Sequence, residues 1–433
     1  MAWAIIAHAM GGKHLLASEG GPPLPRLLES ALADRLKRMP AVVVTGARQT
    51  GKTTIVKLVP GAERRAFHTL DSVPLLDRVR QDPHAFVESS PALTIDEVQR
   101  VPELLLAVKK AIDDDRRKGR FLLTGSANLL LLRRSAESLA GRALYLVLRP
   151  MTEREKRGDR RPPPWNELLA APDAASALAA VPAPGAGFDW ERSALAGGFP
   201  PAALARSGED RELWFRAYVD AFLHRDLQAF ARIDDLASFS RTTRLVALRC
   251  GGLVNYAEIG RDARIPRSTA QRWISILEAS FLATALQPFH RSRAKRLIKS
   301  PKLYPGDTGL FLHLAGITDA RELEKTPGAG AWLEALVLND LLAWSETEIR
   351  RPEVSYYRTA NGEEIDFVVE RGRRLLPIEV KASTRARTED ARTLESFCAE
   401  HGRSAPYGLL LYDGQEPVRL TRTTIAVPLA SVL

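Results

Sequence analysis

The sequence predicts a multidomain α/β protein with a P-loop NTPase parallel sheet, a helical lid, a winged helix and a C-terminal α/β domain of nuclease type. Three features predict it: a glycine-bracketed loop after a buried strand, an acidic strand end about forty residues later, and two C-terminal strands with alternating apolar and charged residues. At 433 residues the chain is too long for one hydrophobic core, and its 45% apolar and 26% charged content is that of a globular protein. We expect four domains, at residues 24–150, 151–237, 238–300 and 301–433.

A phosphate-binding loop is predicted at residues 46–53, GARQTGKT, which fit the pattern G-x-x-x-x-G-K-[ST] at every fixed position. Residues 41–44 before the loop are apolar and mostly β-branched, as in a buried parallel strand. Residues 54–58 after it continue as a helix until Pro60 stops it. Backbone N–H groups and the helix dipole then point at an anion, and this context disfavours the alternative of a chance glycine-rich turn.

This loop is predicted to bind ATP together with Mg²⁺. The Lys52 ammonium would reach the β- and γ-phosphates, and the Thr53 hydroxyl would ligate Mg²⁺. The predicted nucleotide-binding residues are those of the loop and the first helical turn: Gly46, Ala47, Arg48, Gln49, Thr50, Gly51, Lys52, Thr53 and Thr54.

The segment ALTIDEVQ, residues 92–99, is predicted to be a strand that ends in two carboxylates. Asp96 would hold Mg²⁺ directly or through water, and Glu97 would polarise the attacking water. The same pair could be a solvated strand end, but its place about forty residues after a phosphate loop favours the catalytic interpretation. Lys52, Asp96 and Glu97 are therefore the predicted catalytic residues of this site.

Two further polar positions are candidates for the same site. The buried strand at 121–124 ends in small polar residues, and such a strand often carries a γ-phosphate sensor: Thr124, Ser126 and Asn128 qualify, and Ser126 is assigned to nucleotide binding. Arg142 precedes one more apolar strand and is a candidate arginine finger, acting on a neighbouring copy in a homo-oligomer, or else a surface arginine. Alternating strands and helices place the site at the C-terminal ends of a parallel sheet.

After Pro150 the composition changes, and residues 170–186 are almost all Ala and Pro. We expect a helical lid interrupted by this insertion, and then a strong helix over residues 214–230.

Residues 238–289 predict a winged helix that docks on DNA or protein, with a helical bundle as the alternative. The third helix, residues 267–279, has one apolar face and leaves four polar residues outward: Arg267, Ser268, Gln271 and Arg272. A basic run follows at Arg291, Arg293, Lys295, Arg296 and Lys299. Together with the net charge of +10, this run favours DNA as the partner over an anionic membrane.

The C-terminal part combines a buried helix, residues 331–344, with two strands, 364–370 and 376–382, joined by a turn. Period-2 alternation places the charged residues of the two strands on one shared face. Clustered carboxylates beside a lysine suit Mg²⁺-assisted phosphodiester hydrolysis, in which the carboxylates hold the metal and the lysine positions water. The predicted metal ligands are Glu334, Asp366 and Glu379, and the predicted catalytic residues are Asp366, Glu379 and Lys381. The alternative is a cross-strand salt bridge on a wet face.

The location expected is cytoplasmic. Two cysteines, Cys250 and Cys398, suit a reducing compartment, and no apolar run approaches the roughly 18 residues of a spanning helix, so no membrane partner is expected. The first ten residues, MAWAIIAHAM, lack the basic segment and cleavage site of a signal peptide, and Met10 is an alternative start.

In their order, the motifs GARQTGKTT, LTIDEVQR, LLTGSAN, LAGR, DTGL, GEEIDFVVE and PIEVKAS resemble those of prokaryotic AAA+-type ATPases that carry a C-terminal DUF4143 domain. The resemblance covers about residues 24–430 and implies an AAA-like core, a winged-helix segment and a restriction-endonuclease-like domain of the PD-(D/E)XK type. It makes Gly46, Gly51, Lys52 and Thr53 nucleotide ligands, and Glu334, Asp366, Glu379 and Lys381 match the nuclease motif without a substitution. The extended N-terminus and the Ala/Pro insertion depart from the family pattern.

The leading hypothesis is an ATPase that acts on or near DNA and controls a metal-dependent nuclease-like domain. The alternative is a nucleotide-switched protein whose C-terminal domain only docks DNA or a protein partner.

Overall fold

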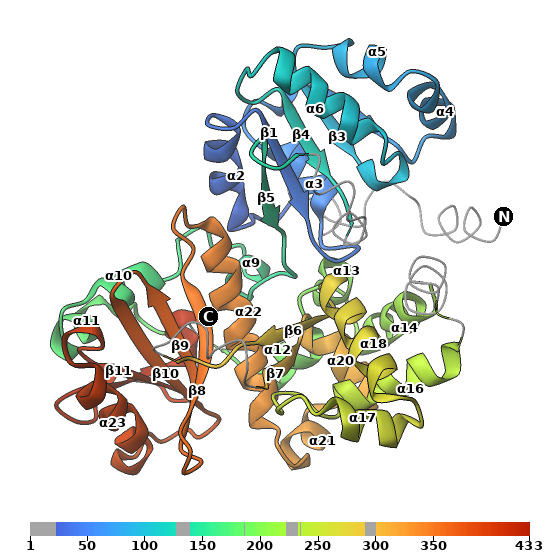
Figure 1. Cartoon of the computed structure of the whole chain (residues 1–433). Coiled ribbons are helices and arrows are strands. Elements are labelled where there is room, and N and C mark those ends of the chain that lie inside the picture. Colours follow the sequence, from blue (N-terminus) through green and yellow to red (C-terminus); the bar gives the residue numbers. More distant parts are fainter. Residues whose placement is uncertain (1–22, 127–138, 186, 222–232, 234, 291–299) are drawn as a thin grey trace.

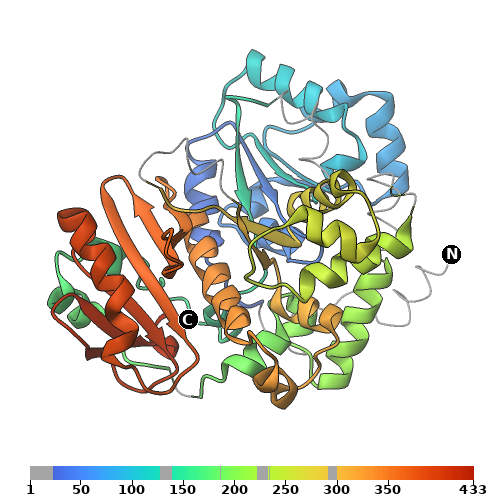
Figure 2. The same ribbon diagram turned by 60° about the horizontal axis from the view of Figure 1, so that its bottom comes forward.

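The computed structural model describes residues 23–126, 139–185, 187–221, 233, 235–290 and 300–433. Two views show an N-terminal sheet (blue) and a C-terminal sheet (orange to red), with a helical middle region (green to yellow) beside them (Figures 1 and 2). The predicted fold class is confirmed at this level: a five-stranded parallel sheet, a helical middle region and a mixed C-terminal sheet. Within the described ranges, no helix is both long and apolar enough to cross a bilayer.

The N-terminal sheet has the strand order β2-β3-β4-β1-β5, and every neighbouring pair is parallel. Its strands are β1 (Ala41–Thr45), β2 (Ala66–Thr69), β3 (Leu93–Asp96), β4 (Phe121–Thr124) and β5 (Ala143–Val147). The central strand β1 is buried along its whole length because both faces of the sheet are covered. The helices α2 (Leu28–Leu36) and α3 (Lys52–Leu58) cover one face, and α4 (Val73–Gln81), α5 (Pro83–Glu88) and α6 (Leu104–Asp114) cover the other.

The middle region begins with six short helices: α9 (Glu153–Lys156), α10 (Trp165–Ala170), α11 (Ala174–Ala180), α12 (Trp190–Ala196), α13 (Pro200–Ala203) and α14 (Gly208–Tyr218). The strong helix expected over 214–230 corresponds to the end of α14, and residues 222–230 lie outside the described part. The Ala/Pro-rich segment is not a detached insertion. Helices α10 and α11 pack on the C-terminal sheet, because Leu168, Ala174 and Ala177 form a buried apolar face.

Three helices and a two-stranded sheet follow: α16 (Leu236–Ala247), α17 (Tyr256–Ala263), α18 (Arg267–Ala279), β6 (Ala283–Leu286) and β7 (Lys302–Pro305). Trp273, Ile274 and Leu277 of α18 are buried, while Arg267, Ser268, Gln271 and Arg272 are exposed, as the spacing predicts. The basic run at 291–299 lies outside the described residues. Two more helices, α20 (Thr308–Ala315) and α21 (Ala320–Lys325), lead to the C-terminal part.

The C-terminal sheet has the order β12-β13-β11-β10-β9-β8. Its strands are β8 (Glu353–Arg358), β9 (Glu364–Arg371), β10 (Arg374–Lys381), β11 (Gly408–Tyr412), β12 (Val418–Arg419) and β13 (Thr424–Pro428). The predicted β9–β10 hairpin is antiparallel, and its turn contains Gly372 at φ +66°. Helix α22 (Gly330–Thr347) packs with α10 on one face, α23 (Arg392–His401) covers the other, and α24 (Leu429–Val432) ends the chain.

The turn at residues 197–199 is bound to the start of α20 through Asp307, the residue that caps α20. Its carboxylate accepts hydrogen bonds from the backbone N–H groups of Leu310 at 2.8 Å, Gly198 at 2.6 Å and Phe199 at 3.2 Å. A Cβ on Gly197 would lie 2.4 Å from this carboxylate, so the turn can approach only because residue 197 is glycine. Desolvation raises the pKa of Asp307, although its three N–H partners favour the charged form.

We expect Asp307→Ala to lower the free energy of unfolding by about 2–4 kcal/mol, because a helix cap is lost and two buried N–H groups lose their acceptor. Urea unfolding followed by circular dichroism measures the change. Asp235→Ala is the matched control, since Asp235 is an exposed cap of α16 that binds the Ser238 N–H at 2.9 Å; its cost should be about 1 kcal/mol. Equal losses in the two variants would contradict the role given to Asp307.

Candidate functional sites: a phosphate loop and a C-terminal acidic cluster

The phosphate loop connects β1 to α3, as the sequence predicts. Gly46 has φ +147°, and a Cβ there would lie 2.2 Å from the carbonyl oxygen of Leu148, so only glycine fits. Gly51 has φ +94° and directly precedes the first residue of α3. The Lys52 Nζ atom donates hydrogen bonds to the carbonyl oxygens of Gly46 at 3.2 Å and Ala47 at 2.7 Å. Burial lowers the pKa of Lys52 to about 8, against the opposing charges of Glu97 and Asp96.

The strand order explains why the loop meets the acidic strand end. Strand β4 lies between β1 and β3, so the C-terminal ends of all three strands are neighbours. The buried Asp96 carboxylate accepts a hydrogen bond from the Thr53 hydroxyl, whose Oγ1 lies 3.0 Å and 3.1 Å from the two carboxylate oxygens. This hydroxyl–carboxylate pair is the oxygen donor set that Mg²⁺ prefers, so the residues present fit this ion.

The neighbouring Glu97 has a left-handed backbone, with φ +61°. Its N–H donates to the Thr124 Oγ1 at 3.1 Å, and the Thr124 hydroxyl in turn donates to Asp96. The Gln99 amide donates to the Glu97 carboxylate. Thr124 and Gln99 therefore hold both acidic side chains in place. Sequence reasoning left Thr124 among three candidates and missed Gln99, although Gln99 lies only two residues beyond the acidic pair.

The remaining positions predicted for this site are Ser126, Asn128 and Arg142. The Ser126 hydroxyl is buried, and among the described residues it has no hydrogen-bond partner, whereas Asn128 lies outside the described ranges. Arg142 forms a bidentate ion pair with Asp113 at the end of α6, with N···O distances of 2.6 Å and 2.9 Å. This pair is partly exposed, and the assignment of Arg142 as an arginine finger stays a prediction.

A buried ion pair anchors the loop to the middle region. Arg26 donates to the carbonyl oxygens of Thr50 at 2.7 Å and Arg149 at 2.6 Å, and its Nε lies 3.1 Å from Glu155 of α9. The side chains of Arg26 and Glu155 are 9% and 4% exposed, so the pair is shielded from water. The pattern of the sequence gave no signal for this pair, because its members are far apart in the chain.

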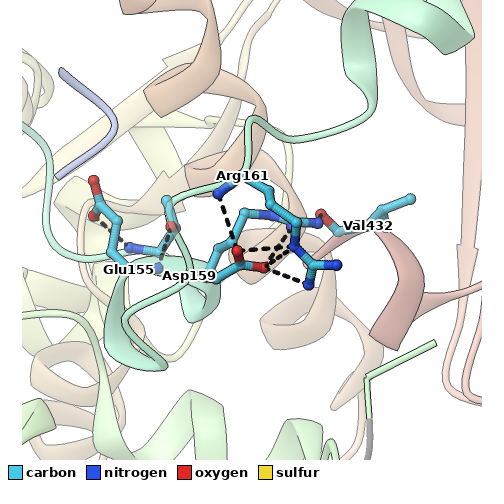
Figure 3. Close-up of polar contacts among 6 residues, drawn as sticks. Glu155, Asp159, Arg161 and Val432 are labelled. Atoms are coloured by element: carbon cyan, nitrogen blue, oxygen red, sulfur yellow. Dashed lines mark hydrogen bonds and ion pairs between the residues drawn. The ribbon is translucent and has the colours of Figure 1, made fainter. Parts of the chain in front are cut away.

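Helix α9 also contacts the end of the chain. Thr152 and Glu155 form a capping box at the start of α9, and the Arg154 guanidinium bonds to Asp159 at 3.0 Å and to the carbonyl oxygen of Val432 at 3.4 Å. The Asp159 carboxylate also accepts hydrogen bonds from the Nε and Nη2 atoms of Arg161, at 3.0 Å and 2.8 Å (Figure 3). Helix α9 thus contacts the C-terminal residues directly and the nucleotide loop through Arg26.

A pocket lies beside the phosphate loop on the side of the Arg26 anchor. The N-terminal segment contributes Pro23 and Leu24, and helix α3 contributes Thr54, Ile55 and Leu58. Residues Met151, Pro200 and Leu204 of the middle region close it. The pocket is therefore mostly apolar and is built from four separate segments of the chain.

In the C-terminal part, the predicted residues gather near the end of the β9–β10 hairpin. The paired register of the hairpin ends at Ile378 opposite Phe367. Beyond it the Asp366 carboxylate accepts the Val380 N–H at 2.8 Å, so Asp366 is buried against β10 and does not point to a wet face. Glu379 forms an ion pair with Lys381 at 2.6 Å on the same strand. Asp366 is not on a wet face because helices cover both faces of the sheet.

The structure adds three residues that sequence reasoning missed: Lys302, Tyr304 and Glu364. Lys302 pairs with Glu364, its Nζ lies 3.8 Å from Glu334, and the Tyr304 hydroxyl donates to Glu334 at 2.5 Å. We call Glu334, Glu364, Asp366 and Glu379 the acidic cluster. The alternation Lys302-Leu303-Tyr304 in β7 was the available signal, since it places the two polar residues on one face.

Burial affects the protonation of Glu334, Asp366 and Glu379. Burial raises the pKa values of Glu334, Asp366 and Glu379, and the lysines partly offset it. For Lys302 burial alone would lower the pKa, but the charges of Glu334 and Glu364 outweigh it and raise the pKa. Within the described part of the chain, no three His, Cys, Asp or Glu side chains are arranged to hold a metal ion. Glu334, Asp366 and Glu379 do not form such a group here, and their assignment as metal ligands stays a prediction.

Family models match three consecutive parts of the chain: an AAA domain at residues 38–156, a domain of unknown function (DUF8612) at 187–321, and a second domain of unknown function (DUF4143) at 329–432. The uncharacterized proteins Rv2008c of Mycobacterium tuberculosis and Mb2031c of Mycobacterium bovis are each 32% identical over 409 residues, covering 92% of this chain and 82% of theirs. The chain thus has an AAA-type P-loop ATPase domain, a DUF8612 segment and a DUF4143 domain.

Two solved structures have low structural similarity to this chain. The Walker-type ATPase PABY2304 of Pyrococcus abyssi is 15% identical with a TM-score of 0.39, covering 70% of this chain and 99% of that one. The RuvB Holliday junction branch migration motor of Thermotoga maritima is 21% identical with a TM-score of 0.27, covering 60% and 86%. At these scores neither protein's activity carries over to this chain.

We expect Thr124→Val to lower kcat for ATP by about 10–100-fold, because a hydrogen bond to a charged group that positions Asp96 and Glu97 is lost. Phosphate release at saturating ATP measures it. Ser126→Ala, on the loop after the same strand, is the comparison. A loss of turnover in Ser126→Ala with little change in Thr124→Val would assign the sensor to Ser126 and contradict the role given to Thr124.

Proposed function

This chain belongs to the same family as the mycobacterial proteins Rv2008c and Mb2031c, and we propose that it is an Mg²⁺-dependent ATP hydrolase that acts on DNA. The observation that carries the hydrolase is the junction of Thr53, in the first turn of α3, with Asp96 and Thr124 at two neighbouring strand ends, with Glu97 held beside it. The free thiols of Cys250 and Cys398 are in keeping with a reducing, cytoplasmic setting.

The residues divide the work of hydrolysis between them. Lys52 and the backbone N–H groups of the loop would bind the phosphates, and Thr53 with Asp96 would hold Mg²⁺. The bound ion would neutralise charge between the β- and γ-phosphates. Glu97 would orient and polarise the attacking water, with Gln99 and Thr124 fixing its carboxylate and backbone.

The pocket beside the loop is proposed to hold the base of the nucleotide. Its apolar walls, formed by Leu24, Ile55, Met151 and Leu204, suit the flat faces of adenine. Because the middle region supplies Met151 and Leu204, bound nucleotide would touch two domains at once. Binding would therefore favour one arrangement of the middle region over others.

Lys52→Ala should abolish ATP turnover because the phosphates lose their counter-charge, and Glu97→Gln should reduce it by about 10²–10⁴-fold because the general base is lost. Steady-state phosphate release measures both. Glu97→Gln should still bind ATP, which a fluorescent ATP analogue reports. Lys57→Ala is the matched control for Lys52, since Lys57 is an exposed lysine of the same helix.

Unchanged hydrolysis in Lys52→Ala or Glu97→Gln would refute the assigned roles. The same assay tests the proposed homo-oligomer. If Arg142 acts on a neighbouring copy, mixing Arg142→Ala with Lys52→Ala protein should restore part of the turnover. No rescue would assign Arg142 to its ion pair with Asp113 alone.

DNA is proposed as the partner because α18 exposes a polar face beside a two-stranded sheet, which is the arrangement of a winged helix. Arg267→Ala should weaken binding to duplex DNA and reduce the slope of log K against log salt by about 1, because one phosphate contact is lost. Fluorescence anisotropy across a salt series measures it. Arg321→Ala on α21 removes an equal exposed charge and should leave the slope unchanged. Equal slopes in both variants would contradict docking through α18.

Metal-dependent cleavage of DNA by the C-terminal domain is a second candidate function, favoured by Asp366, Glu379 and Lys381 at one end of a hairpin. Incubation of supercoiled and linear DNA with Mg²⁺ or Mn²⁺, with and without ATP, tests it. Cleavage that Lys381→Ala abolishes would support it. No cleavage under any of these conditions would leave the domain as a docking module, which is the alternative function.

A further inference from the structure

The hairpin β6–β7 brings a lysine into the acidic cluster of another domain. Lys302 is the first residue of β7, and its side chain is 7% exposed. Its backbone neighbours are fixed on the side opposite β6 as well, because Gly251 and Val254 donate hydrogen bonds to the carbonyl oxygens of Leu303 and Pro301, each at 2.8 Å. The lysine is therefore held by structure that belongs to the α16–α18 region.

At its tip Lys302 has the surroundings of a bound cation. The Nζ atom pairs with Glu364, lies 3.8 Å from the Glu334 carboxylate and lies 3.5 Å from the Tyr304 hydroxyl. The rings of Tyr304 and Tyr356 have their centroids 6.0 Å and 5.8 Å from it. Aromatic faces and carboxylates both favour a positive charge at this point.

Two lysines form ion pairs with carboxylates of the acidic cluster. The carboxylates belong to Glu334, Glu364, Asp366 and Glu379, and Lys381 pairs with the last of these. Lys302 pairs with Glu364 and lies 3.8 Å from Glu334, and the electrostatic influence of Asp366 reaches it as well. Arg358, on the edge strand β8, lies 3.7 Å from Glu364. A divalent cation would have to share these oxygens with an ammonium group of the same sign, which repels it.

We propose that Lys302 is a tethered cation that takes the position of a divalent metal in the acidic cluster, so that the cluster binds no divalent ion while β7 is docked. This inference rests on the residues around the acidic cluster and not on the ATP hydrolase, and it predicts no metal-dependent cleavage by the C-terminal domain while β7 is docked. It gives the Glu334 and Glu364 carboxylates a compensating positive charge within the fold. It also makes the α16–α18 region, and not the C-terminal domain alone, responsible for the chemistry of the cluster.

The test is Mn²⁺ binding to the full-length, nucleotide-free protein, measured by isothermal titration and by the electron paramagnetic resonance signal of free Mn²⁺. Wild-type protein should show no Mn²⁺ binding that depends on Asp366. Lys302→Met, which keeps the length of the side chain and removes the charge, should bind Mn²⁺ at least ~10-fold more tightly than wild type. The double variant Lys302→Met/Asp366→Asn should lose this gain.

Lys325→Met is the matched control because it removes the same charge from an exposed position on α21, and it should gain no Mn²⁺ affinity. Circular dichroism and the Tm establish that each variant is folded, and Lys302→Gln replaces Lys302→Met if the latter does not fold. Asp366-dependent Mn²⁺ binding by wild-type protein as tight as by Lys302→Met would overturn the proposal. So would a folded Lys302 variant without any gain. Neither result bears on ATP turnover, so this proposal and the hydrolase fail separately.

Discussion

The buried ion pair between Arg26 and Glu155 is the contact that fixes the nucleotide loop to the rest of the molecule. Arg26 holds the carbonyl oxygen of Thr50 inside the loop and that of Arg149 just beyond β5, while its charge is balanced by Glu155 of α9. Removing one member of a buried pair typically costs about 3–5 kcal/mol, because the other charge stays buried without a partner. The adjacent residue, Arg154, binds the carbonyl oxygen of Val432, so one turn of helix connects the loop to the last residues of the chain.

The two polar sites solve the problem of buried charge in different ways. At the phosphate loop, hydroxyl groups of Thr53 and Thr124 surround a single carboxylate, Asp96, and Lys52 is bound to backbone carbonyl oxygens. Uncharged donors leave that carboxylate available to a cation. In the C-terminal domain, two of the carboxylates, Glu364 and Glu379, are paired with lysine ammonium groups from the same chain. The first arrangement is suited to a ligand that comes and goes, and the second to a stable internal pairing.

Local signals predicted the parts of the structure that depend on neighbouring residues. The phosphate loop, the acidic end of β3, the buried face of α18 and the β9–β10 hairpin all follow from residue types at fixed spacings. The parts that were missed depend on contacts between distant residues. Lys302 meets Glu364 only because β7 docks on another domain, and α11 covers β13 only because the C-terminal sheet exists to receive it. The contact between Thr124 and Asp96 became evident only once β4 was known to lie between β1 and β3, and the choice of γ-phosphate sensor stays a prediction.

Helix α22 contacts the ATPase sheet at one end and carries Glu334 of the acidic cluster near the other. Glu334 lies in its second turn, and Glu346, one residue from its end, accepts the N–H of Val147 in the edge strand β5 at 3.2 Å. The twelve residue steps from Glu334 to Glu346 span about 18 Å of uninterrupted helix at 1.5 Å per residue. Strand β5 is the neighbour of β1, which leads into the phosphate loop. Helix α22 therefore links the ATPase sheet to the acidic cluster. If it tilted as a rigid body by about 10° at its contact with β5, Glu334 would move by about 3 Å.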